Sequence, residues 1–299
     1  MSTTHRNAPE PPPVGGILWS IAGDIRSVLA LPAATALQVA HPGVGAGVDQ
    51  HSAFRTDPWG RGERSLRSVQ LWMYGGRDDA AEEGRRLRKV HETIRGTDAH
   101  GRPYRALDPA LYAWVHATAF PAYLQAQRHL GRRPFTGAEE RQLYAELLRV
   151  GRVLGIEDRD MPPTVEEFWP YYRRVLREEL EATAVVRELV TVDRSLPPPD
   201  RGPWPVRLAL RAAWPVLVSP FARLRAFLTV GLMPPDAREA IGLPWTAARE
   251  RRLRRFGLAV RVVVPLLPER WRYLPVAREA RRAARHKGPS PAAQRAGDG

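Results

Sequence analysis

Residues 108–131 read DPALYAWVHATAFPAYLQAQRHLG, and this stretch decides the fold class. Asp108 can cap a helix that has Pro109 in its first turn. Proline is tolerated there because a backbone N–H in the first turn has no partner within the helix. Apolar and aromatic residues then recur at helical spacing as far as Leu130, and Gly131 supplies a stop signal. The sequence therefore predicts one helix over residues 108–130.

Similar signals recur along most of the chain. Caps and apolar residues at helical spacing predict further helices over residues 24–40, with a kink at Pro32, and over 78–95, 136–154, 164–190, 203–217, 220–231 and 246–258. The best candidate for a strand, residues 259–267, is short and is interrupted by Pro265. We therefore expect an all-α fold.

The helical pattern covers residues 14–282, which we expect to form a single domain. Residues 1–13 are rich in proline, and residues 283–299 are rich in Arg, Gly, Ser, Pro and Ala. Neither segment has apolar periodicity, so both are predicted to be disordered tails. The prolines at 197–199 mark the clearest internal linker.

The formal charge of +14 comes almost entirely from arginine, since Lys89 and Lys287 are the only lysines. No recognition motif accompanies this charge, so we expect no nucleic-acid partner. The N-terminus lacks the basic-then-apolar order of a secretory signal, and arginines and prolines interrupt the apolar stretch 208–233. We therefore expect a cytoplasmic protein, with peripheral contact to a membrane as the alternative to full solubility.

The absence of cysteine excludes disulfides, iron–sulfur clusters and thiolate-ligated heme. Among the histidines, His116 lies inside the 108–130 helix, one turn from both Tyr112 and Phe120. A neutral imidazole on such an apolar face needs a partner, because a buried unsatisfied nitrogen costs about 1–3 kcal/mol. A backbone carbonyl and an iron atom with a flat apolar macrocycle are both suitable partners.

Two further segments contain histidines in chemically suggestive settings. His91 shares one helix face with Leu87, Arg88 and Ile94, which fits either a solvated basic edge or the wall of a pocket for an anionic cofactor. His41 and His51 bracket a stretch in which Gly43, Gly45 and Gly47 alternate, so a flat ligand or another helix can approach closely.

A dinuclear metal site is a further interpretation of the same histidines. His41, Asp49, His51 and Glu92 could supply the ligands, but the Glu-x-x-His pairs of di-iron helix bundles are missing. The sequence therefore favours this site less than the heme interpretation.

Several of these residues fall in segments that resemble the catalytic domain shared by latex-clearing rubber oxygenases and the mycophenolate-pathway oxygenase of the MpaB type. The matching segments are LQVAHPGVGAGV (37–48), HSAF (51–54), DPWGR (57–61), RKVH (88–91), GRPY (101–104), ALDP (106–109), WVHAT (114–118), RVGRVLG (149–155) and MPPT (161–164). Their order and spacing hold over about residues 20–235.

The resemblance implies a globin-like helical domain around a b-type heme, held by one proximal histidine and faced by an arginine-bearing helix. By position, His116 resembles the proximal iron ligand, and Arg88 and His91 resemble the catalytic, pocket-lining segment. The rest of the implied cofactor-binding set is His41, Tyr112 and Thr118. In the rubber enzymes a lysine and a threonine stand near the iron, whereas His91 and Glu92 fall at those places here.

The leading hypothesis is therefore a heme-dependent oxidoreductase that acts on an apolar substrate of the isoprenoid or lipid class. One alternative is a helical module that binds lipid or heme without turnover and docks on an anionic membrane. Another is a basic nucleic-acid binder, which predicts DNA binding that falls steeply with salt.

Overall fold

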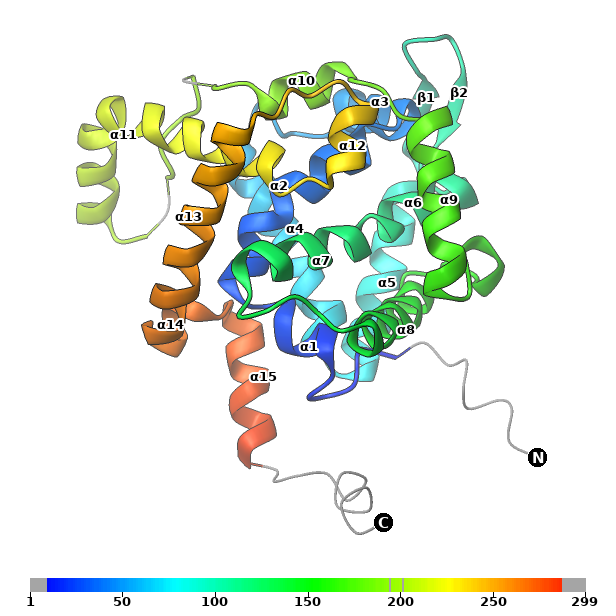
Figure 1. The fold of residues 1–299 in the computed structure, drawn as a ribbon, viewed down its shortest axis with the longest axis horizontal. Helices are drawn as coiled ribbons and strands as arrows, with labels where there is room; N and C mark the ends of the chain where they lie inside the picture. The colour runs from blue at the N-terminus through cyan, green and yellow to red at the C-terminus, as the bar shows by residue number, and fades with distance from the viewer. Residues whose placement is uncertain (1–9, 194, 201, 287–299) are drawn as a thin grey trace.

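The computed structural model describes residues 10–193, 195–200 and 202–286, and these are mainly helical (Figure 1). The first helices are α1 (Ile17–Ile21), α2 (Ile25–Val39), α3 (Pro42–His51), α4 (Pro58–Tyr74), α5 (Arg77–Glu92), α6 (Pro109–Ala117), α7 (Ala119–Leu130) and α8 (Gly137–Val153). They are followed by α9 (Val165–Glu178), α10 (Ala184–Val190), α11 (Trp204–Gly231), α12 (Pro235–Ala240), α13 (Ala247–Val263), α14 (Glu269–Arg272) and α15 (Pro275–His286). Short 3-10 turns, η1 (Asp158–Asp160) and η2 (Val264–Leu266), connect some of them.

The expected all-α class is confirmed, with one small exception. Strands β1 (Arg95–Thr97) and β2 (Pro103–Arg105) form an antiparallel hairpin, which is the only sheet in the described ranges. The sequence did not predict this hairpin, because each strand has three residues and no apolar alternation. The globin-like arrangement implied by the resemblance stays a prediction.

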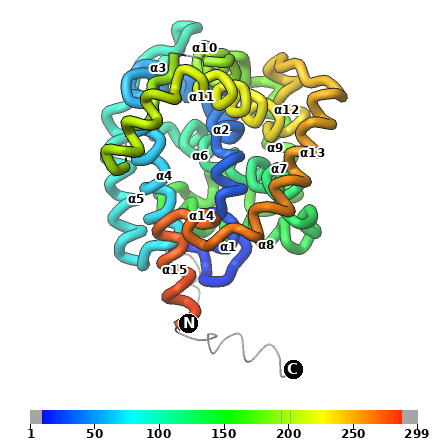
Figure 2. The backbone as a smooth tube through the Cα atoms, turned by 90° about the vertical axis from the view of Figure 1, so that its left-hand side faces the viewer, coloured from blue at the N-terminus to red at the C-terminus, as the bar shows by residue number. Residues whose placement is uncertain are grey.

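Helix α2 runs through the middle of the molecule, as Figures 1 and 2 both show. The side chain of Asp24 caps it by accepting a hydrogen bond from the backbone N–H of Arg26, and the helix continues through Pro32. Its buried residues, among them Leu37, pack against α7 and α11. This central position makes α2 a wall of the cavity described below.

The predicted helix over residues 108–130 is divided in two at Thr118. Pro121 lies in the first turn of α7 and has no N–H, so an unbroken helix would leave the carbonyl of Ala117 without its usual donor. At the break, the hydroxyl of Thr118 donates to the carbonyl of Val115, at 2.7 Å. The break sets the directions of α6 and α7 independently.

The predicted helix over residues 164–190 is also divided, into α9 and α10. The connection is tied to the end of α2: Glu181 N–H donates to the carbonyl of Ala40, and the Thr183 hydroxyl donates to that of Val39. The same hydroxyl caps α10 by accepting from Val186 N–H. Tertiary hydrogen bonds, which sequence periodicity does not report, therefore override the continuous pattern.

Two further differences concern continuity and connections. The two pieces expected at 203–217 and 220–231 form the single helix α11, which contains Pro215 and Pro220. Residues 259–267, the rejected strand candidate, belong to the end of α13 and to η2, in agreement with the expectation. Helices α3, α4 and α15 occupy segments for which no helix was expected.

The expected tails lie largely outside the described residues, which begin at residue 10 and end at 286. Within the described part, Glu10 forms ion pairs with Arg77 and Arg149. Residues 283–286 belong to α15, so the expectation of disorder was wrong for these four positions. Arg285 pairs there with Glu269, at 2.7 Å, which helps to hold the end of the helix.

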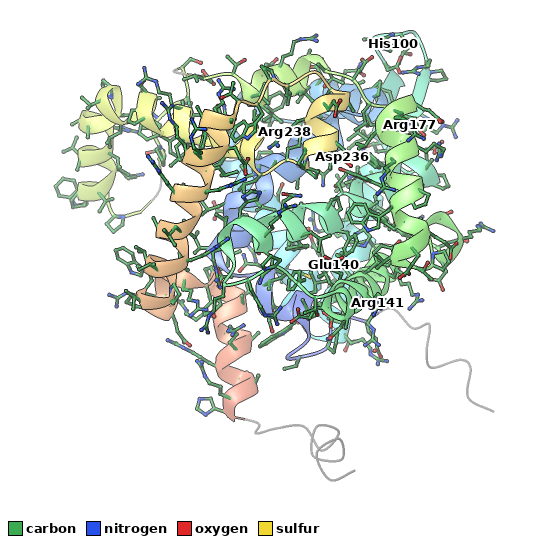
Figure 3. The ribbon with its side chains drawn as sticks, viewed as in Figure 1. His100, Glu140, Arg141, Arg177, Asp236 and Arg238 are labelled. Carbon is green, nitrogen blue, oxygen red and sulfur yellow. The ribbon has the colours of Figure 1, made fainter. Side chains whose placement is uncertain are left out.

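Charged side chains such as His100, Arg141 and Arg177 are exposed on the outside of the bundle (Figure 3). No helix in the described ranges is long and apolar enough to cross a bilayer alone. Only the pair α2 and α3, bent by 109° at their junction, meets the length and composition criteria together.

Candidate functional site

A cavity of about 450 Å³ lies between α2, α4, α5, α6, α7 and α8. Its volume is in the range typical of small-molecule sites. Most of the lining is apolar, and it includes Leu31, Val69, Trp72, Leu87 and Val115. A few polar groups converge on this apolar surface, as the next paragraphs describe.

The side chain of His116 is buried and lies in the cavity wall. Its Nε2 is 2.7 Å from the carbonyl oxygen of Leu147, and because a carbonyl only accepts, Nε2 carries the proton. Burial lowers the pKa of His116, so the ring is neutral near pH 7. Its Nδ1 is therefore unprotonated, and it makes no hydrogen bond within the described ranges.

Helix α8 confines one edge of this imidazole. A Cβ added to Gly151 would lie 3.3 Å from both Cδ2 and Nε2 of His116. The opposite edge, formed by Nδ1 and Cε1, faces away from α8. A glycine at position 151 therefore lets helix α8 approach the ring closely.

His91 and Tyr112 form a second group in the cavity wall. Their rings meet edge to face, with centroids 5.6 Å apart. Nδ1 of His91 donates to the carbonyl of Leu87, at 2.7 Å, so in the neutral form of the ring Nε2 is the acceptor nitrogen. Burial raises the pKa of Tyr112, so its hydroxyl stays protonated. His116, His91 and Tyr112, which the sequence singled out, therefore line the same cavity.

Two arginines in the lining, Arg64 on α4 and Arg86 on α5, were not singled out from the sequence. Arg86 donates to buried Glu83, at 2.6 and 2.7 Å, and Glu83 also accepts from Ser68. These hydrogen bonds, chiefly the one from Arg86, lower the pKa of Glu83. Asp57-Pro58, which begins α4 as Asp108-Pro109 begins α6, was the signal that could have identified this wall.

The other three expected cofactor-binding residues do not line this cavity. Arg88 is exposed and packs over Gly155, where its Nη1 donates to the carbonyl at 3.2 Å. Thr118 is buried at the α6–α7 junction. His41 caps α3 through Nδ1 and pairs with Glu179 through Nε2, at 3.2 Å. Burial lowers the pKa of His41 despite this carboxylate.

The possible dinuclear metal ligands are not assembled. His51 lies against the carbonyl of Arg95 and Asp49 pairs with Arg55, at 3.2 and 2.6 Å respectively. Across the described part of the chain, no group of three or more His, Asp or Glu side chains could hold a metal ion. The glycines of α3 serve close packing instead: Gly45 lies against Val39 and Thr183.

Comparison with known proteins gives a family match and two similar proteins. The model of the family described as "ER-bound oxygenase mpaB/B'/Rubber oxygenase, catalytic domain" matches residues 19–262. Uncharacterized protein Mb2261 of Mycobacterium bovis and uncharacterized protein Rv2237 of Mycobacterium tuberculosis are each 28% identical over 246 residues. Those alignments cover 80% of this chain and 90% of each relative. No solved structure matches.

Proposed function

The chain belongs to the mpaB/rubber-oxygenase catalytic-domain family, and from that premise we propose that a heme binds in the cavity beside His116. The domain is therefore of the oxygenase catalytic type. The observation that carries the proposal is a buried, neutral histidine with an unprotonated nitrogen in the wall of a largely apolar cavity. When bound, the heme iron would supply activation of dioxygen or a peroxide.

The residues around His116 fit this group. A neutral imidazole is the form that ligates iron, and burial keeps His116 neutral. Nδ1 makes no hydrogen bond within the described ranges and is the nitrogen that could bind the iron, while the Nε2–H group keeps its hydrogen bond to the carbonyl of Leu147. Such a hydrogen bond at the second ring nitrogen orients a ligating histidine.

The cavity also offers a partner for a carboxylate of a heme. Arg64 and Arg86 are the arginines in the lining, and a guanidinium pairs with a carboxylate through two parallel hydrogen bonds. Arg86 is already paired in this way with Glu83, so we assign propionate anchoring to Arg64. Arg88, which the sequence suggested for this role, is turned toward Gly155.

The remaining lining indicates the class of substrate. Its aromatic and aliphatic side chains exclude water and favour an apolar molecule of the isoprenoid or lipid class. In the neutral form of its ring, His91 presents Nε2 as a group that can accept a proton or a hydrogen bond from a bound molecule. We assign it the role of general base or orienting group.

Titration with hemin tests the proposal. We expect the purified protein to bind one hemin with an intense Soret band, and His116→Ala to weaken binding and change the band. His129→Ala is the matched control, because His129 lies on α7 outside the cavity lining. Equal hemin binding and identical spectra for the wild type and His116→Ala would refute the role of His116.

We also propose docking on an anionic membrane as a second candidate function, because the first half of α11 is largely unpacked. Trp204, Leu208 and Val216 are 70%, 61% and 77% exposed, and Arg207 and Arg211 lie beside them. Such a helix can bury apolar side chains at a bilayer surface while its arginines meet anionic headgroups.

Vesicle binding tests this second candidate. We expect co-sedimentation with vesicles of phosphatidylcholine and phosphatidylglycerol that salt weakens and that Leu208→Glu abolishes. Leu258→Glu, at an exposed position on α13, is the control for adding a charge. Self-association without vesicle binding would instead assign this surface to a second copy of the chain.

A further inference from the structure

A second cavity, of about 920 Å³, lies at the N-terminal end of α4 and shares no lining residue with the cavity beside His116. Its walls come from α4, α10, α11 and the connection that precedes α11. This site is therefore separate from the proposed heme site.

Aromatic side chains form one wall of this second cavity. The rings of Trp59 and Phe221 both line it, with centroids 5.7 Å apart, and Trp214 packs against both. The indole N–H of Trp59 donates to the carbonyl of Pro197, at 2.9 Å, which fixes the orientation of the ring. The wall is rigid and apolar, as is typical of sites that bind a hydrocarbon or an aromatic body.

Two arginines in the lining have guanidinium groups that are incompletely partnered. The guanidinium of Arg61 makes no hydrogen bond or ion pair with any described residue, and burial and the nearby charge of Arg64 lower its pKa. Arg225 has a buried Nε with no hydrogen-bond partner in the described ranges, and its Nη2 is 3.3 Å from the carbonyl of Thr191. A partly buried guanidinium without an anion is costly.

The other charged groups of the lining are already engaged. Arg55 pairs with Glu188 and Asp49, each at 2.6 Å, and Arg187 donates to the carbonyl of Ala182. Asp193 accepts from the N–H and hydroxyl of Ser195, which lower its pKa. Among its described residues the lining has four arginines and two carboxylates. Asp193 is the carboxylate that interacts with Arg225, through space, so positive charge remains in excess around Arg61 and Arg225.

From this arrangement we propose that the second cavity binds an amphiphile with one anionic headgroup, such as a fatty acid. The headgroup would accept hydrogen bonds from Arg61 and Arg225, and the apolar body would lie along Trp59 and Phe221. A carboxylate or a phosphate suits the two guanidinium groups equally. Most of the lining surface around the two arginines is apolar, so the bound molecule should also carry an apolar body.

Fluorescence titration with 11-(dansylamino)undecanoic acid, its methyl ester and inorganic phosphate tests the proposal on the full-length protein. We expect the acid to bind at least about tenfold more tightly than the ester, since charge-assisted hydrogen bonds are lost in the ester. Inorganic phosphate should compete only weakly. Arg61→Met combined with Arg225→Met should weaken binding of the acid by about tenfold or more.

The controls separate this site from the proposed heme site. Arg67→Met with Arg223→Met removes two exposed charges from the same helices, outside both linings, and should leave binding unchanged. His116→Ala should also bind the acid normally. If the double variant at 61 and 225 does not fold, Arg61→Met alone serves, because it removes a group without partners and should not lower the melting temperature.

Three results would overturn the proposal directly, and a fourth would assign the probe to the other cavity. They are absence of binding by the wild-type protein, equal binding of acid and ester, and normal binding of the acid by the folded Arg61→Met and Arg225→Met variants. Loss of acid binding in His116→Ala would assign the probe to the other cavity and would equally contradict it.

Discussion

The imidazole of His116 is held between the carbonyl of Leu147 and the backbone of Gly151. An iron ligand has to keep one orientation, and close packing against a helix supplies it. The same closeness leaves the ring little room to adapt, because a side chain at 151 would press on the edge that carries Nε2. Substitution of Gly151 should therefore affect heme binding.

Gly151→Ala should weaken hemin binding while changing stability little. The added Cβ would lie 3.3 Å from the ring and push it by a few tenths of an ångström, while alanine favours the helix by roughly 0.5–1 kcal/mol. Hemin titration and urea unfolding measure the two effects. Gly137→Ala, on the same helix but with only an ordinary contact to Arg141, should bind hemin normally. Normal hemin binding by Gly151→Ala would contradict this view of the ring.

Substitutions of Arg64 and Arg88 should have different effects on hemin affinity, which tests how a heme is anchored. Arg64→Met should weaken hemin binding about twofold to fivefold, as expected for a largely exposed ion pair, and should not affect hemin dimethyl ester. Arg88→Met should leave both affinities unchanged, because Arg88 does not line the cavity. If Arg88→Met weakened hemin binding and Arg64→Met did not, Arg88 would be the propionate anchor, as the sequence suggested, and the assignment to Arg64 would be wrong.

Helices α5 and α8 meet at Gly84, which makes this contact a determinant of the cavity walls. A Cβ on Gly84 would lie 2.1 Å from the carbonyl oxygen of Val153, an atom of the backbone that cannot rotate away. His91 and Arg86 lie on α5, and Leu147 lies on α8. Spacing between these two helices therefore sets the distance between the two sides of the site.

Gly84→Ala should lower the free energy of unfolding by about 1–3 kcal/mol, because the helices have to separate. Urea unfolding measures this change. Gly62→Ala is a suitable control, since a Cβ at position 62 meets no atom within 4 Å and should leave the protein as stable or more stable. A Gly84→Ala variant as stable as the wild type would show that this contact is not close in solution.

The start of α8 predicts a dependence of stability on pH. Hydrogen bonds from Arg133 and Thr136 lower the pKa of Glu139 from 4.5 to about 2. The folded state thus favours the charged carboxylate, and this stabilisation is present above pH 4.5 and is lost as the pH falls toward 2. The stability difference between the wild type and Glu139→Gln should therefore shrink over this range in pH-dependent urea unfolding. Glu82→Gln, an exposed change on α5, is the control, and a constant difference for Glu139→Gln would contradict the prediction.

Helix ends with local signals could be predicted, whereas breaks and joins could not. The capping box of Thr136 and Glu139 and the Asp108-Pro109 start are confirmed. The break between α9 and α10 depends on hydrogen bonds to Val39 and Ala40, residues far away in the sequence. Such contacts leave no periodic signal in the segment that they interrupt.

On the scale of the whole molecule, the cavity arises where six helices meet, so no single segment encodes it. Resemblance to the family identified His116, His91 and Tyr112, which lie together in the structure. It did not separate Arg64 and Arg86 from the many other arginines of a chain with a net charge of +14. It also gave no indication of the second cavity, whose walls come from segments more than a hundred residues apart.

One absorption spectrum tests the central claim most directly. The protein would be measured as purified, then after reduction with dithionite and addition of carbon monoxide. We predict a Soret band that shifts when carbon monoxide binds and that is weakened or displaced in His116→Ala. A protein that is colourless as purified, and remains so after incubation with hemin, would contradict the account.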